Sequence, residues 1–539
     1  MKLTFTLIIL CFSLELMAQK AGTPDTSFAG QGKLLSTTSL GLPYAAQSVV
    51  IKKDGAILVG SGEGTAFLLK QFLNNGIPDS SFGVAGEART VFKNYLDAYT
   101  TSVNITNDNK IIAAGTGGGG IGTHNSDILL AKYLANGKTD SSFGKNGSVA
   151  IDLKLIEVIN CMKITNQGKI LVAGYCAAGD EKKDNCFLAQ FNNDGSIDTN
   201  FGDSGKVVTD VGASYQSYIN SIAVAPDGSI VTAGSAKYIP NSKQDQILLA
   251  KYTVDGKLET DFGTNGLVFT DVGSDADYGY AVALQNDKKI VVAGAANYLI
   301  QDSTAMVIVR YNNDGSLDKS FNNTGALPVF FGNDDAGARA LSLQPNGDYI
   351  IGGVKFVDYT SPPNYAADDF ALASVTKEGK IDSSFGTNGI TTTDFSEFDD
   401  GCAALALQQD GKIIAAGGST DVTNRITYIT LARYNGFLTQ KQIIVQKIKH
   451  YIQTHNARAT TLNNVSVYPN PAQSILHIQG LLSNAKLTVV DLSGRIAASS
   501  ELRAVSGVYD LNIASLHAGN YLLKIETNGE VVTKQFVKE

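Results

Sequence analysis

The sequence predicts an all-β protein: a seven-bladed β-propeller of four-stranded units of about sixty residues, followed by a small C-terminal β-sandwich. Glycine supplies 55 of the 539 residues, and tyrosine and phenylalanine supply 22 and 23. Glycine turns between aromatic and β-branched runs are typical of β-structure. A second observation is a sequence repeat, which indicates an array of equivalent units. The third is a change of pattern near residue 465, which indicates a separate domain.

The repeat is defined by three blocks that recur in a fixed order. The first block reads approximately Asp-x-Ser-Phe-Gly, the second resembles DGKIIAAG and the third resembles ILLAKY. The phenylalanine of the first block lies at positions 28, 82, 143, 201, 262, 321 and 385. The glycine that closes the second block lies at positions 60, 115, 174, 234, 294, 353 and 417. This spacing predicts seven equivalent units over residues 19–434.

Each unit is predicted to contain four short strands. In the fourth unit these are residues 206–209, 221–224, 230–234 and 247–252, with an Asp-Gly turn at 227–228. An Asp-Gly pair between apolar runs is a strong hairpin signal, because glycine supplies the positive φ that the turn requires. Four-stranded repeats without helices favour a propeller, and a β-solenoid, whose turns are usually shorter, is the alternative.

Two further patterns bear on how the units pack. One position is small in every unit, which predicts a crowded place where the blades converge; its residues are Ser48, Ser102, Cys161, Ser221, Ala281, Ala340 and Ala404. The first predicted strand, residues 32–36, precedes the first complete unit. If this strand completes the last blade, the two ends of the array interlock.

The three blocks resemble the delta-60 repeat, a bacterial β-propeller-like repeat. The resemblance covers residues 24–434 and is most specific at residues 382–389 and 410–417. Ala29 and Asn322 replace the usual glycine in two units. This family is defined by its repeat, so the resemblance implies a fold and supplies no catalytic residues.

Residues 1–18 are typical of an export signal peptide. Lys2 is followed by a mostly apolar stretch at 3–14, and Ala18 supplies the small residue for cleavage. The apolar stretch is too short to span a bilayer, and we expect no transmembrane segment in the rest of the chain. Residues 435–465 are predicted to be a connector, for which both a helix and a strand remain open.

Residues 466–539 are predicted to form the small β-sandwich, with strands near 476–478, 487–491, 508–511, 519–525 and 531–537. The segment resembles the type IX (Por) secretion sorting domain in its YPNP block at 468–471, its DLSGR turn at 491–495 and its terminal KQFVK at 534–538. The resemblance implies recognition by the type IX secretion machinery, and location outside a Gram-negative cell or on its outer surface. A carbohydrate-binding or spacer domain is the alternative.

Candidate ligand-binding residues lie in the loops after the first strand and before the last strand of each unit. These loops are expected on one face of a propeller, and their candidates are Asp275, Asp277, Asp334, Asp335, Asp399, Asp400, Tyr359 and Tyr365. Carboxylates are the ligands that Ca²⁺ prefers, so Ca²⁺ is a candidate cofactor. Solvated acidic loops are the alternative interpretation, since none has the spacing of a known calcium loop.

Other chemistry is less well supported by the sequence. We nominate no catalytic residue, because the five histidines form no metal-binding or Ser-His-Asp pattern. The net charge of −8 argues against a nucleic-acid partner. Cys176 and Cys186 flank one polar loop, and we consider a loop-closing disulfide between them.

We therefore expect a secreted or cell-surface propeller that acts as a binding or adhesion module for an extracellular glycan or protein. Two alternatives are an extracellular polysaccharide-active enzyme and a purely structural surface scaffold.

Overall fold

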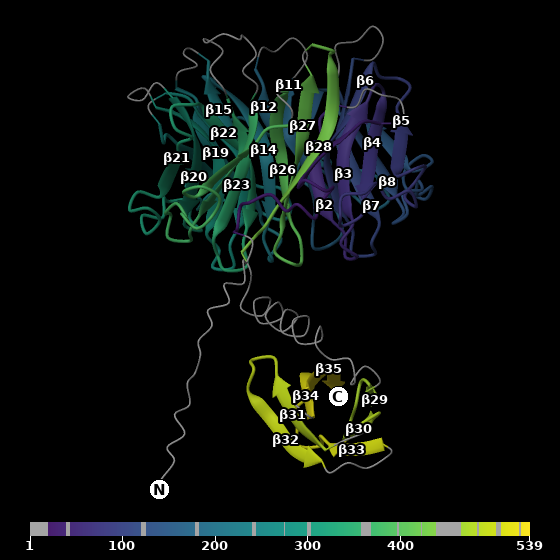
Figure 1. Cartoon of the computed structure of the whole chain (residues 1–539). Helices are drawn as coiled ribbons and strands as arrows, with labels where there is room; N and C mark the ends of the chain where they lie inside the picture. Colours follow the sequence, from purple (N-terminus) through teal and green to yellow (C-terminus); the bar gives the residue numbers. More distant parts are fainter. Residues whose placement is uncertain are drawn as a thin grey trace. The chain divides into compact units, whose positions relative to one another are not determined.

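The computed structural model describes residues 20–539 apart from 39–43, 120–125, 178–182, 240–243, 274, 299–302, 357–367, 396–397, 422, 438–464, 482–483, 503–507 and 528–529. Every element with bounds in this part of the chain is a β-strand, which confirms the all-β prediction (Figure 1). Two compact units are present, one comprising Gln19–Phe437 and the other including Leu438–Glu539. The expected signal peptide, and residues 438–464 of the expected connector, lie outside the described residues.

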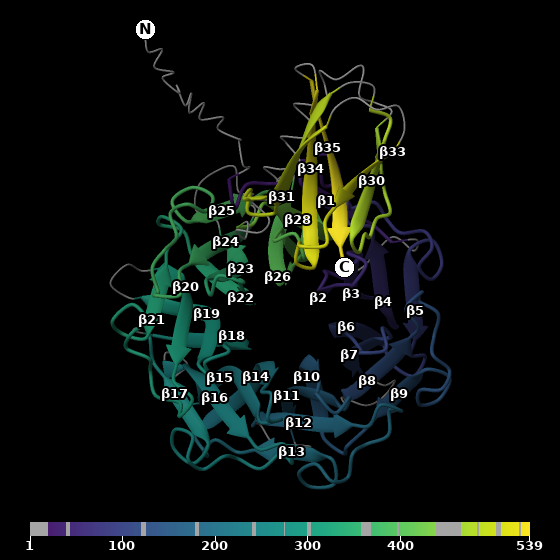
Figure 2. The ribbon, with the colours of Figure 1, turned by 90° about the horizontal axis from the view of Figure 1, so that it is seen from below.

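Strands β1 to β28 follow one another around a ring in antiparallel groups of four (Figure 2). Five groups are separate four-stranded sheets, and the groups β2–β5 and β6–β9 are joined into one eight-stranded sheet by the pairing of Gly62 in β3 with Tyr99 in β6. The innermost strands are β2 Ser48–Ile51, β6 Asp97–Ile105, β10 Ile156–Ile164, β14 Tyr215–Val224, β18 Asp277–Leu284, β22 Ala336–Leu343 and β26 Asp399–Leu407. The second strands are β3 Ile57–Glu63, β7 Ile111–Gly118, β11 Ile170–Ala177, β15 Ile230–Tyr238, β19 Ile290–Tyr298, β23 Tyr349–Lys355 and β27 Ile413–Asp421. The third strands are β4 Ala66–Phe72, β8 Asp127–Tyr133, β12 Asn185–Phe191, β16 Gln246–Tyr252, β20 Ser303–Tyr311, β24 Asp369–Val375 and β28 Ile426–Tyr434. The outermost strands are β5 Glu87–Val91, β9 Ser148–Ile151, β13 Lys206–Thr209, β17 Leu267–Thr270, β21 Ala326–Val329, β25 Ile390–Thr393 and β1 Lys33–Ser36.

The N-terminal strand completes the last group of the ring. Strand β1 pairs with β28 in the register Lys33↔Ala432 to Ser36↔Ile429. Just before this strand, Asp25 Oδ2 lies 2.6 Å from Lys412 Nζ and 2.8 Å from Arg433 Nε. Strand β1 therefore completes the last group, which is the case in which the sequence analysis expects the two ends of the array to interlock.

The strands of each group run between two ends of the ring. We call one the turn end, because it carries the tight turns between innermost and second strands, which are Asp-Gly in three groups, and the repeat phenylalanines between third and outermost strands. We call the other the loop end. It carries the connections from second to third strands, and the links from each outermost strand to the innermost strand of the next group.

At the turn end, a ring of hydrogen bonds joins each group to its neighbour. The residue after each repeat phenylalanine donates its backbone N–H to a carbonyl oxygen of the adjoining group at 2.7–3.0 Å; the donor–acceptor pairs are Ala29–Asn75, Gly83–Asn136, Gly144–Asp194, Gly202–Asp255, Gly263–Asp314, Asn322–Glu378 and Gly386–Ala21. All seven repeat phenylalanines are at most 2% exposed. The Phe-Gly block therefore serves the packing of one blade on the next.

The glycine that closes the second block is required by a close backbone approach. A Cβ atom on Gly234 would lie 1.8 Å from the carbonyl oxygen of Tyr218, and one on Gly294 would lie 1.8 Å from that of Tyr278. The register of the innermost strand shifts beside these glycines, between Ile219 and Ser221 in β14. Such a β-bulge brings the inner strand against its partner and leaves no room for a side chain.

The C-terminal unit contains two antiparallel sheets. One has the order β29 Ser466–Tyr468, β30 Ile475–Gln479, β33 Val508–Asn512, and the other has the order β32 Ile496–Leu502, β31 Ala485–Asp491, β34 Gly519–Thr527, β35 Glu530–Lys538. Side chains from both sheets, such as Leu476, Leu487 and Phe536, share one buried core. This is the small β-sandwich that the sequence predicts.

Candidate functional site

The seven innermost strands surround a central cavity of about 480 Å³. The small residues noted in the sequence, from Ser48 to Ala404, all line it, which explains why no unit carries a large residue there. The residue before each of them also lines the cavity or its rim; the members of this set are Gln47, Thr101, Asn160, Asn220, Tyr280, Arg339 and Ala403. In six of the seven inner strands this preceding residue is the extra residue of the β-bulge. We call this set the bulge ring.

Members of the bulge ring differ in what they do. Asn160 donates from its side-chain amide to the Ile219 carbonyl, and Asn220 donates to the Gly279 carbonyl, both at 2.9 Å, so these amides bridge neighbouring blades. Arg339 is exposed and lies over the ring of Tyr280, with 5.4 Å between the guanidinium carbon and the ring centroid. Such a cation–π pair holds a flexible cation in a defined place.

The charge of the cavity is opposite to that of the whole chain. Lys163 and Arg339 line it, and the described lining residues include no aspartate or glutamate. The chain as a whole carries a net charge of −8. A cavity with low-dielectric walls and one sign of charge attracts ligands of the other sign.

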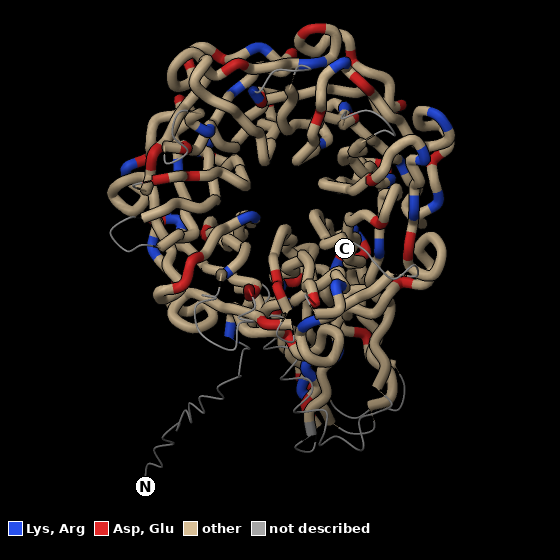
Figure 3. Tube along the Cα trace, turned by 90° about the horizontal axis from the view of Figure 1, so that it is seen from above, with Lys and Arg blue, Asp and Glu red and all other residues tan. Residues whose placement is uncertain are grey.

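Acidic residues occur around the ring rather than in a single patch (Figure 3). At the loop end, three innermost strands carry a buried carboxyl at one equivalent repeat position, namely Glu157, Asp277 and Asp400. Burial raises the pKa of Glu157 to about 7, that of Asp277 to about 6 and that of Asp400 to about 7. Each accepts backbone N–H groups of the link that precedes its strand, as Asp277 does from Val272 and Asp400 from Phe395.

The structure changes the interpretation of the predicted acidic residues. Asp277 and Asp400 are at most 1% exposed, so the prediction that they lie on an exposed ligand-binding surface is wrong. Their carboxylate oxygens instead accept backbone N–H groups of the preceding link, and so hold that link against the blade.

The other predicted residues lie at separate blade junctions. Asp334 pairs with Lys355 at 3.0 Å, and Asp335 accepts the N–H of Thr304 at 2.5 Å. Asp275 and Asp399 are partly buried. The predicted Tyr359 and Tyr365 lie outside the described residues.

The predicted disulfide is not formed. Cys176 and Cys186 are free thiols. The pairing of β11 with β12 places Cys186 opposite Tyr175, and Cys176 opposite Asn185. Adjacent positions on a strand point to opposite faces, so Cys176 packs in one hydrophobic core and Cys186 in the next.

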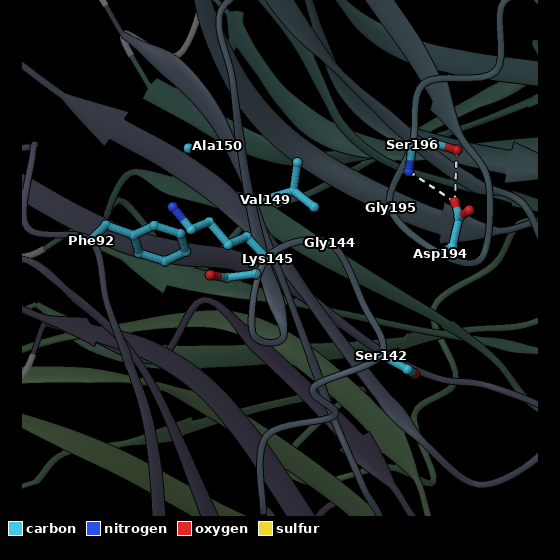
Figure 4. Close-up of a pocket in the computed structure, with 10 residues that line it drawn as sticks. Phe92, Ser142, Gly144, Lys145, Val149, Ala150, Asp194, Gly195 and Ser196 are labelled. Carbon is cyan, nitrogen blue, oxygen red and sulfur yellow. Dashed lines mark hydrogen bonds between the residues drawn. The ribbon is translucent and has the colours of Figure 1, made fainter.

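A second hollow, of about 630 Å³, lies beside the outermost strand β9 (Figure 4). Two of its hydroxyl groups, those of Ser142 and Ser196, are already used by turns. Ser196 donates from both its N–H and its hydroxyl to Asp194 Oδ1, at 2.9 and 2.7 Å. The labelled side chains do not converge on one point, and the central cavity is the stronger candidate site.

Sequence reasoning missed the bulge ring and the buried carboxyl of Glu157. The signal for the ring was present, because each member immediately precedes a small residue that the repeat identified. For Glu157 the signal was weaker, since the equivalent position holds Asp277 and Asp400 in two units but Ser217 and Ala336 in two others.

Comparison with protein-family models gives two matches. The secretion system C-terminal sorting domain matches residues 466–539. A β-propeller domain of unknown function, DUF5122, matches residues 106–143, 168–201, 285–321 and 408–436. No curated protein sequence matches the chain.

The solved structures that this chain resembles include one β-propeller domain. PorZ, a surface component of the type IX secretion system of Porphyromonas gingivalis, is 11% identical with a TM-score of 0.36; the match covers 92% of this chain and 59% of PorZ. A PL25 ulvan lyase is 10% identical with a TM-score of 0.45, covering 74% of this chain and 94% of the lyase. The propeller domain of the trilobed protease of Pyrococcus furiosus is 11% identical with a TM-score of 0.38, covering 74% and 95%.

The chain is therefore a secreted β-propeller protein with a C-terminal sorting domain of the type IX secretion system. Its place is the extracellular space or the outer surface of a Gram-negative bacterium, and its C-terminal domain interacts with the secretion machinery. The described residues contain no helix with the length and apolarity that a membrane span requires.

Proposed function

We propose that the propeller is a non-enzymatic binding or adhesion module that takes an extracellular glycan at its central cavity. The observation that carries this proposal is the bulge ring. Every unit presents one residue to the cavity or its rim from the equivalent backbone position, yet those residues include an amide, a hydroxyl, an aromatic ring and a cation. A purely structural requirement would favour one residue type, as it does for the repeat phenylalanine.

The chemistry of the ring suits a polar, anionic glycan. Amide and hydroxyl groups exchange hydrogen bonds with sugar hydroxyls, and a tyrosine ring packs on the apolar face of a sugar. Arg339 presents a planar fork of donors that matches a carboxylate or a sulfate. Together with Lys163, it favours a polysaccharide that carries uronate or sulfate groups over a neutral one. An extracellular protein as ligand is an outcome that the test distinguishes.

Two alternatives are less well supported. A polysaccharide-active enzyme would use carboxyl groups whose pKa lies near neutrality, which Glu157 and Asp400 have. Those groups are buried in blade junctions and accept backbone N–H groups, so they do not face the cavity. A scaffold would not require varied side chains at the cavity.

The test is a binding screen of the full chain against polygalacturonate, alginate, a sulfated glycan, neutral dextran and a set of matrix proteins, with product release measured in parallel. We expect saturable binding of the acidic polysaccharides without product release, and a loss of at least about tenfold in affinity for Tyr280→Ala, since truncating one central aromatic anchor removes that much. Product release would favour the enzyme, binding to matrix proteins alone would favour a protein ligand, and no binding at all would favour the scaffold.

A further inference from the structure

Three carboxyl groups meet at the loop end, at the junction of the second and third groups of strands. Asp127 is the first residue of β8, Asp152 follows β9, and Glu157 is the second residue of β10. Each offers a carboxylate oxygen that lies within 4.8 Å of the other two. Three separate segments of the chain thus bring their acidic side chains to one point.

Two oxygens of this cluster are buried without a hydrogen-bond partner. Glu157 is 0% exposed; its Oε1 accepts N–H groups from Leu153 at 3.0 Å and Leu155 at 3.2 Å, while Oε2 has no partner. Asp127 Oδ2 accepts the hydroxyl of Tyr95 at 2.6 Å, while the buried Oδ1 has no partner. A buried carboxylate oxygen without a donor or a cation is unfavourable, so a cation bound at this point would stabilise the pair.

A lysine side chain beside the cluster, that of Lys154, is only weakly held there. Lys154 Nζ lies 2.8 Å from Asp152 Oδ2, but its side chain is 86% exposed. An exposed ion pair of this kind contributes little, and it leaves the orphan oxygens of Glu157 and Asp127 unpaired.

The repeat itself shows that the fold does not require a carboxyl here. The positions equivalent to Glu157 hold Ser217 in β14 and Ala336 in β22, both 0% exposed. Asp277 in β18 is an equivalent buried carboxyl, and it accepts N–H groups from Val272 and Gly273. Asp400 in β26 accepts from Phe395 on one oxygen and from the Ser419 hydroxyl on the other. Glu157 therefore differs from its equivalents by a free, buried oxygen that faces other acids.

We propose that Asp127, Asp152 and Glu157 form a Ca²⁺ site. Ca²⁺ prefers several carboxylate oxygens and accepts irregular geometry, whereas Mg²⁺ requires a near-octahedral shell and retains its waters. The ion supplies the charge that the two orphan oxygens lack. It ties the start of β8 to the link between β9 and β10, and so orders one sector of the loop end. This site is independent of the glycan-binding proposal.

The experiment titrates the full chain, stripped with EDTA, with CaCl₂ and with MgCl₂ by calorimetry, and records its melting temperature in each. We expect saturable Ca²⁺ binding in the micromolar to millimolar range, and an increase of about 2–4 °C in melting temperature at saturation. Mg²⁺ should produce less than half of that increase.

Glu157→Gln keeps the shape and the N–H contacts at Oε1 but removes the charge, so it should abolish both the heat and the melting shift. Asp277→Asn, at the equivalent position of another unit, is the matched control and should retain them. Asp127→Asn serves as a second site variant if Glu157→Gln does not fold. The readout is the calcium-induced change within each variant, so altered basal stability does not affect it. No heat from the wild type at about 10 mM Ca²⁺, or an equal response from Glu157→Gln, would overturn the proposal.

Discussion

The two ends of the propeller shift the pKa of aspartate side chains in opposite directions. At the turn end, Asp140 accepts hydrogen bonds from Lys110 and Ser142, which lower its pKa to about 2. At the loop end, burial raises the pKa of Asp277 to about 6. The turn end repeats its contacts in all seven groups, whereas at the loop end buried carboxyls occur in three innermost strands. The backbone contacts that close the ring are uniform, whereas the buried carboxyls of the loop end and the bulge ring of the cavity differ from one group to the next.

Removing the N-terminal strand should break the turn-end ring most severely. Deletion of residues 20–36 removes the β1–β28 pairing, the ion pairs of Asp25 and the Gly386–Ala21 hydrogen bond. We expect the free energy of unfolding to fall by more than about 4 kcal/mol, measured by urea denaturation. Gln31→Ala, an exposed side chain in the same segment, is the control and should be near neutral. Unchanged unfolding after the deletion would contradict ring closure by this strand.

Alanine substitutions at two glycines distinguish a steric clash with a neighbouring strand from strain at a positive φ. Gly234→Ala places a methyl group 1.8 Å from a carbonyl oxygen and should destabilise the protein by about 3 kcal/mol or more. Gly168→Ala meets nothing within 4 Å at its φ of +77°, and should cost about 1 kcal/mol. The two variants are compared by chemical denaturation. Equal losses would show that the inner strands can move apart, contrary to the bulge geometry.

The buried Asp277 predicts a pH dependence that is specific to the loop end. Its folded pKa is about 6 against 3.8 for the ordinary group, so between pH 4 and 6 the folded state holds a proton that the unfolded state has released. Stability therefore falls as pH rises through this window. Asp277→Asn should be more stable than wild type above pH 6 by about 2 kcal/mol relative to their difference at pH 4, measured in EDTA. A difference independent of pH would contradict this assignment.

Asp140 predicts the opposite slope at the turn end. Its folded pKa of about 2 lies below the ordinary 3.8, so its contribution is present above pH 4 and is lost as pH falls through 2. Asp140→Asn should be less stable than wild type by about 1 kcal/mol at pH 7 and equal to it near pH 2. Acid-dependent melting curves of the two proteins provide the check, and a constant gap at all pH values would contradict it.

The repeat made most of the fold predictable. Phe28 to Phe385 and the closing glycines mark contacts that every blade needs, and identical contacts leave identical residues in the sequence. The disulfide between Cys176 and Cys186 was wrong because it depended on a one-residue register between two strands, which loop length does not determine. The prediction for Asp277 and Asp400 failed for a related reason. The sequence does not show whether an aspartate next to a loop is exposed to solvent or is buried and accepts hydrogen bonds from the backbone of that loop.

The cavity could not have been derived from composition alone. Arg339 and Tyr280 lie 59 residues apart in sequence, in separate units, and meet because both occupy bulges of neighbouring innermost strands. Glu157, Asp127 and Asp152 likewise come together at a junction that depends on how far one blade is rotated from the next.

The central claim, that the varied cavity serves binding while the uniform turn end serves the fold, is tested most directly by one paired measurement. Polygalacturonate binding and melting temperature are recorded for the full chain, for Arg339→Ala and for Lys145→Ala, an exposed cation outside the cavity. We predict that Arg339→Ala weakens binding by about tenfold or more, while its stability stays within about 0.5 kcal/mol of wild type, and that Lys145→Ala changes neither. Equal binding by wild type and Arg339→Ala, or equal loss in both variants, would contradict the claim.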